Sequence, residues 1–144
     1  RFGLGYPAPG DETRIVNQQP ARTTLRSLQP VIDSQAVIEL QARTDEVKLD
    51  ESLVEYVLQL ATATRDHDDL LVGVSPRGSI ALAQAARGTA LLDDRDYCVP
   101  EDIVSNVLSV CAHRIISKTA LHDGDTTTTR RIMQQVLETI TSPT

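Results

Sequence analysis

The helical spacing of apolar residues between Asp50 and Arg65 limits the fold of this 144-residue chain more than any other feature. Apolar side chains recur there three and four positions apart and cover a wide face: Leu53, Val54, Tyr56, Val57, Leu58, Leu60 and Ala61. Asp50 precedes them as an N-cap, because its side chain can accept hydrogen bonds from the free N–H groups of a first turn. So much apolar surface predicts a helix in the centre of the domain.

The same spacing predicts five further helices separated by polar loops. They are expected at 12–19, at 34–43, at about 76–92, from Pro100 through Cys111, and over a last stripe formed by Ile132, Met133, Val136, Leu137 and Ile140. Only residues 46–49 alternate polar and apolar side chains as a strand does. The fold class predicted is therefore all-α, with about six helices and no internal repeat.

The first ten residues, RFGLGYPAPG, differ from the rest because they hold three glycines and two prolines. Glycine and proline break regular structure, so residues 1–10 are predicted to be a connector. Residues 11–144 are predicted to form the helical domain itself.

Composition excludes several classes of protein. Aromatic residues make up 3% of the chain and tryptophan is absent, so the core must be aliphatic. The net charge of -6 gives no general attraction to nucleic acid or to an anionic membrane, and it disfavours a helix-turn-helix domain. No apolar run approaches the roughly 20 residues that span a bilayer, and no signal peptide opens the chain. A cytoplasmic protein is expected.

The two cysteines are Cys98 and Cys111, and neither belongs to a CxxC pair. Their spacing suggests neither a zinc site nor a disulfide framework. Both are therefore expected to be core thiols in a reducing compartment.

The stretch VSPRGS, residues 74–79, combines a strong helix start with an unfavourable charge. Ser75 is predicted to be the N-cap and Pro76 the first helical residue. Arg77 then places a cation in the first turn, where the helix dipole is positive, at a cost of about 0.3 to 1 kcal/mol. A bound anion such as a phosphate would offset this cost. An ion pair with the carboxylates of 66–69, or a guanidinium in solvent, is the commoner explanation for such an arginine.

Other polar residues give weaker signals. His67 lies among three aspartates, but the segment lacks the HExxH or EF-hand spacing of a metal site and is expected to be a solvated loop. His113 is expected to pack near a helix end, and His122 to lie in a polar loop. The chain has no GxxxxGK[ST], GxGxxG or GxSxG motif, so it carries no catalytic apparatus of its own.

Several segments, in order and spacing, resemble the C-terminal portion of MoxR-type AAA+ ATPases. They are RFGLGYP, LVEYVLQLATATR, GVSPRGSIALAQAARGTALLDDRDYCVPEDI and VLSVCAHRI, and together they extend over nearly the whole chain. The resemblance implies that this chain is the helical lid that closes over nucleotide bound by an α/β ATPase core. It implies that Arg77 is the sensor 2 arginine, which reaches the terminal phosphates of ATP with Ser75 and Pro76 beside it.

The resemblance also implies a role for Arg1, which Phe2 follows as in the family, as an arginine that acts on the nucleotide of a neighbouring subunit. The phosphate loop and the Mg²⁺-binding segment would lie in the core before residue 1. The resemblance therefore implies ATP and Mg²⁺ as ligands of the parent protein, and no ATP hydrolysis by this chain alone. Gly78 and Gly88 stand where the family usually has alanine, and each could cost about 1 kcal/mol of helix stability.

The partners implied by the resemblance are the chain's own ATPase core and neighbouring subunits, in a hexameric ring. Such a parent couples ATP hydrolysis to chaperone-like remodelling of client proteins, including proteins with von Willebrand-type domains. A helical protein-interaction module that acts without an ATPase core is the alternative.

Overall fold

The computed structural model describes residues 5–18, 27–119 and 126–143, and the chain divides into two compact units. Among the described residues, one unit comprises 5–18 and 27–39, and the other comprises 40–119 and 126–143. The described residues form six helices and two short strands, which confirms the all-α fold class.

The smaller unit holds α1 (Pro9–Gln18) and the first six residues of α3 (Ser34–Glu46). Helix α1 begins three residues before the predicted start and takes in the last two residues of the predicted connector. The cause is local, because proline suits a first helical position and Asp11 and Glu12 lie in the first turn, where the helix dipole favours carboxylates.

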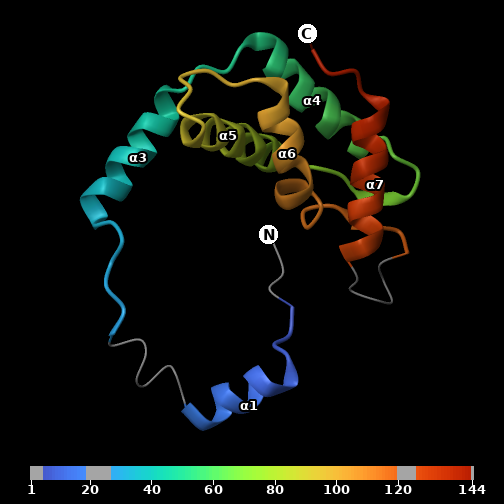
Figure 1. Ribbon diagram of the computed structural model, residues 1–144. Helices are drawn as coiled ribbons and strands as arrows, with labels where there is room; N and C mark the ends of the chain where they lie inside the picture. The colour runs from blue at the N-terminus through green and yellow to red at the C-terminus, as the bar shows by residue number, and fades with distance from the viewer. Residues whose placement is uncertain (1–4, 19–26, 120–125, 144) are drawn as a thin grey trace. The chain divides into compact units, whose positions relative to one another are not determined.

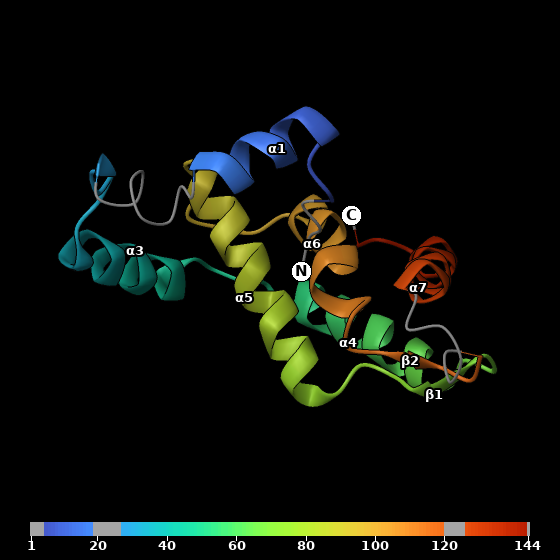
Figure 2. The same ribbon diagram turned by 90° about the horizontal axis from the view of Figure 1, so that it is seen from below.

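The larger unit is built on α4 (Glu51–Arg65), α5 (Pro76–Leu92), α6 (Pro100–Cys111) and α7 (Thr126–Thr139). The bounds of α4 and α5 agree with the prediction, and Asp50 caps α4 by accepting the Ser52 N–H at 2.9 Å. Helix α5 packs against α4 and α6, and α7 packs against the same two helices (Figures 1 and 2). Among the described residues, no helix has the length and apolar character needed to cross a membrane.

The core of the larger unit is aliphatic, as the composition predicts. Its most deeply buried side chains come from all four helices: Leu60, Leu82, Ile103, Val107, Ile132 and Met133. Cys98 and Cys111 also lie in this core as free thiols, as predicted.

The extended structure lies elsewhere than predicted. Strand β1 (Leu70–Val72) pairs antiparallel with β2 (Ile116–Ser117). The predicted strand at 46–49 is wrong, because Glu46 ends α3 and only Lys48 forms an isolated parallel bridge, to Tyr97. That bridge is made by the Lys48 N–H bonded to the Asp96 carbonyl and the Cys98 N–H bonded to the Lys48 carbonyl, both at 2.9 Å.

Candidate functional site

The candidate site is the N-terminal end of α5. Ser75 has the extended backbone of an N-cap (φ -74°, ψ 163°), and its Oγ accepts the Gly78 N–H at 3.3 Å. The Ser75 carbonyl accepts the N–H groups of Gly78 and Ser79 at 2.8 and 3.1 Å. Pro76 occupies the first helical position, where it has no N–H to satisfy. Both Ser75 and Pro76 are exposed, so the predicted cap and first turn lie at the surface.

Arg77 is exposed, and no acidic residue lies in the first turn of α5. Within residues 5–18, 27–119 and 126–143, Arg77 makes no hydrogen bond or ion pair. The ion pair with Asp66–Asp69 considered above therefore does not form in this part of the chain. A guanidinium in solvent stands beside the positive end of a helix, and an anion can bind both.

The end of α4 fixes where α5 begins. The Thr64 Oγ1 accepts the Val74 N–H at 2.9 Å, and the Arg65 Nε donates to the Val74 carbonyl at 2.8 Å. Gly73 passes so close to α4 that a Cβ there would lie 2.6 Å from the Arg65 backbone nitrogen. Glycine is therefore required at 73, and the backbone that leads into Ser75 is held against the last turn of α4.

A second cation packs beside the same turn of α5. A Cβ placed on Gly78 would lie 3.6 Å from the Cδ of Arg114, so the stem of Arg114 lies next to the residue that follows Arg77. The Arg114 Nη1 donates to the Val110 carbonyl and lies 2.8 Å from the His113 Nε2. This arrangement places the Arg114 charge at the C-terminal end of α6, where the helix dipole is favourable for a cation.

The remaining sequence candidates lie apart from this site. The Nδ1 of His67 accepts the Asp69 N–H at 3.1 Å, within its own loop. In the described part of the chain, no group of three or more His, Cys, Asp or Glu side chains could hold a metal ion. Arg1, Phe2 and His122 fall outside the described residues.

Sequence reasoning did not identify Thr64, Arg65 or Gly73 as residues that position the site. The two side chains act on a backbone nine and ten residues further along the chain. These contacts depend on the path by which the chain returns past α4. They leave no periodic pattern in the sequence from which they could be predicted. Only Gly73 carried a signal, because glycine ahead of an N-cap indicates a tight approach.

These features define a class of domain: a helical bundle in which the capped start of one helix carries an arginine that pairs with none of the described residues. Residues 62–136 match the family model described as the AAA lid domain. That match covers more than half of the chain and includes all of α5 and α6. The chain belongs to the AAA lid domain family, and it is similar to part of two proteins named MoxR.

Two curated proteins are similar to this chain. The uncharacterised protein YeaC of Bacillus subtilis is 38% identical over 81% of this chain and 36% of its own length. The chaperone MoxR1 of Mycobacterium tuberculosis is 28% identical over 99% of the chain and 40% of its own length. The chain thus spans well under half of the curated relatives that it matches.

The chain is also similar in structure to part of a solved protein. A protein of Cytophaga hutchinsonii, predicted to be an ATPase, superposes with a TM-score of 0.76 at 26% identity. The match covers 98% of this chain and 45% of that protein.

Proposed function

We propose that Arg77 is the sensor 2 arginine of this lid and contacts the terminal phosphates of ATP held by an α/β core. The observation that carries the proposal is an exposed arginine, unpaired within the described residues, at the capped N-terminus of α5. A triphosphate offsets both the guanidinium and the positive helix end, which are unfavourable neighbours without it.

The residues at this helix end can bind an anion. They would form only one wall of its pocket, and the ATPase core would form the rest. The planar guanidinium of Arg77 can bridge two phosphate oxygens, and Ser75 and Pro76 close the helix end beneath it. In the proposal Mg²⁺ is held by the core, together with the β- and γ-phosphates. The lid orients the terminal phosphate and stabilises the charge that develops on it, so this chain alone is not expected to hydrolyse ATP.

The wider role is proposed from the family. We infer a parent ATPase that couples hydrolysis to chaperone-like remodelling of clients or of a partner with a von Willebrand-type domain, in the cytoplasm. Its subunits would form a hexameric ring in which Arg1 reaches the nucleotide of a neighbour. The family match does not favour the alternative of an interaction module without an ATPase core.

The test compares Arg77→Ala and Arg77→Lys in the intact protein that contains this chain. Losing a donor at a reacting centre reduces turnover by roughly 100-fold, so Arg77→Ala should lose most ATP hydrolysis while its thermal stability stays close to wild type. Arg77→Lys should recover only part of the turnover, because an ammonium keeps the charge and loses the planar fork.

Arg43→Ala is the matched control, since Arg43 is also an exposed arginine near a helix end. Turnover should be unchanged in this variant. Wild-type turnover in Arg77→Ala would remove Arg77 from the site.

A further inference from the structure

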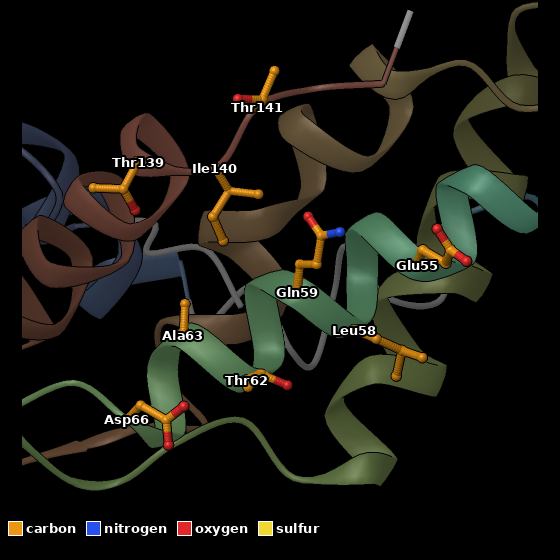
Figure 3. A pocket seen from close by; sticks show the side chains of 9 residues that line it. All are labelled: Glu55, Leu58, Gln59, Thr62, Ala63, Asp66, Thr139, Ile140 and Thr141. Atoms are coloured by element: carbon orange, nitrogen blue, oxygen red, sulfur yellow. The ribbon is translucent and has the colours of Figure 1, made fainter.

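A groove of about 670 Å³ lies between one face of α4 and the residues at and just beyond the end of α7. Figure 3 shows the Ile140 side chain extending toward α4, with Glu55 and Asp66 at opposite ends of the helical stretch. Leu58, Ala63 and Ile140 provide its apolar surface. The groove belongs entirely to the larger unit, and none of its lining residues is part of the Arg77 site.

The apolar surface continues along α4 beyond the groove. Leu58 is 51% exposed, and Val54, one turn earlier on the same side of the helix, is 39% exposed. Single exposed aliphatic residues are ordinary on a protein surface. Two that stand four residues apart beside a groove form a stripe with helical spacing, and a second helix can pack along such a stripe.

The ionisable groups that line the groove are both carboxylates, those of Glu55 and Asp66. Their side chains make no ion pair or hydrogen bond with any residue that the structure describes. Asp66 is the C-cap residue of α4, where the helix dipole is negative, so its charge does not stabilise the helix that carries it. The two carboxylates are eleven residues apart, which corresponds to about 16 Å along a helix axis.

We propose that this groove docks an amphipathic helix of another polypeptide, which carries a large aliphatic side chain between two basic residues about eleven positions apart. The aliphatic side chain would pack on Leu58 and Ile140, and the basic residues would reach Glu55 and Asp66. A helix running along α4 has the same rise per residue, so it matches the spacing of the two carboxylates. The proposal does not depend on nucleotide binding and goes beyond the function proposed above.

The negative charge of the groove disfavours two other ligands, a second copy of this chain and a nucleotide. A second copy of this chain carries a net charge of -6 and would be repelled by the carboxylates. A nucleotide would be repelled in the same way. A basic helix is attracted to both ends of the groove and covers the apolar surface between them.

The probe is a fluorescently labelled, alanine-rich helical peptide with a central leucine flanked by two arginines eleven positions apart. Its binding to the intact protein that contains this chain is followed by fluorescence anisotropy. The protein variants are the double substitution Glu55→Gln with Asp66→Asn, and Leu58→Ala. Glu101→Gln with Glu138→Gln is the matched control, because it removes the same charge from exposed carboxylates outside the groove.

We expect the peptide to bind the wild-type protein and the control variant equally. The Glu55→Gln, Asp66→Asn protein should bind it roughly three- to tenfold more weakly, and a peptide with glutamines in place of the arginines should lose a similar factor. Leu58→Ala should weaken the binding of both peptides.

Three results would overturn the proposal. The peptide could fail to bind the intact protein. It could bind both double variants equally, which would indicate diffuse attraction to an acidic chain. Self-association that Leu58→Ala abolishes in sedimentation would assign the groove to a second copy. None of these results depends on ATP turnover, so they leave the role of Arg77 unaffected.

Discussion

The Thr64 hydroxyl accepts the Val74 N–H at 2.9 Å and donates its own proton to the Ala61 carbonyl at 2.6 Å. Thr64 and Val74 are both buried, and the two residues are 0% and 2% exposed. The hydroxyl thus joins the last turn of α4 to the residue before the N-cap of α5. The position of Arg77 therefore depends on one buried hydroxyl in the preceding helix.

Thr64→Val should destabilise the domain by about 1 to 3 kcal/mol, because it keeps the shape of the side chain and leaves a buried N–H without a partner. The free energy of unfolding in urea measures this effect. Thr62→Val, an exposed site on the same helix, should change it by less than about 0.5 kcal/mol. Equal stability of the two variants would show that the Thr64 hydroxyl is not needed.

Gly73→Ala should destabilise the domain by about 1 to 3 kcal/mol or more. The added Cβ would lie 2.6 to 2.7 Å from backbone atoms of Thr64 and Arg65, so α4 and the loop would have to separate. Gly88→Ala is the contrasting variant, because a Cβ there meets nothing within 4 Å. It should stabilise α5 by about 0.4 to 1 kcal/mol. Thermal unfolding should show a lower midpoint temperature than wild type for Gly73→Ala and a higher one for Gly88→Ala.

The glycines show what sequence reasoning could and could not predict. Helix propensity assigns Gly78 and Gly88 the same cost, since both lie within α5. The structure separates them, because a Cβ at Gly78 would lie 2.7 Å from Cγ1 of the buried Val74. Propensity is a property of one residue, whereas this contact depends on the path of the loop before α5.

The helices were predictable for a physical reason. Leu53, Leu60 and the other apolar residues of α4 repeat with the period of the helix, and Asp50 marks its start. Strands β1 and β2 have three and two residues, too few to show alternation, and their partners lie more than forty positions apart. Arg77 attracts attention in the sequence because its charge conflicts with the helix dipole. That it pairs with no carboxylate among the described residues could be read only from the folded chain.

Neither cysteine should react quickly with a thiol reagent in the native protein. Burial raises the pKa of Cys98 and raises that of Cys111 to about 11, so little thiolate forms at neutral pH. Cys98 is 7% exposed and Cys111 1%, so Cys98 should be modified first. Mass spectrometry after timed alkylation measures the order, with urea-unfolded protein as the control. Faster labelling of Cys111 would contradict the packing around α6.

Arg95 and Asp102 form the most complete ion pair in the described part of the chain. The guanidinium nitrogens Nη1 and Nη2 of Arg95 donate to separate carboxylate oxygens of Asp102 at 2.8 and 2.7 Å, and Asp102 also accepts the Val99 N–H at 2.8 Å. Asp102 is 2% exposed. Burial alone would raise the pKa of Asp102, but the hydrogen bonds from Arg95 and Val99 outweigh it and hold this pKa below its ordinary value of 3.8.

Asp102→Asn should therefore lower the free energy of unfolding by about 2 to 3 kcal/mol at neutral pH. It removes the buried carboxylate that accepts both Arg95 nitrogens, leaves Arg95 with the exposed Asp93 alone, and weakens the start of α6. Asp96→Asn is the control, because the Lys48–Asp96 pair spans 3.8 Å between side chains that are about 80% exposed. It should cost less than about 0.5 kcal/mol.

The pH dependence of the same variant has a definite sign. A carboxyl group whose pKa is lower in the folded state than in the unfolded state stabilises the fold above the unfolded value, and this contribution is lost as the pH falls through the folded pKa. The stability gap between wild type and Asp102→Asn should be constant well above pH 3.8 and should narrow below it. Urea unfolding across this range measures the gap. A gap that stays constant into acid would mean that Asp102 acts through its shape and hydrogen bonds, with no contribution from its charge.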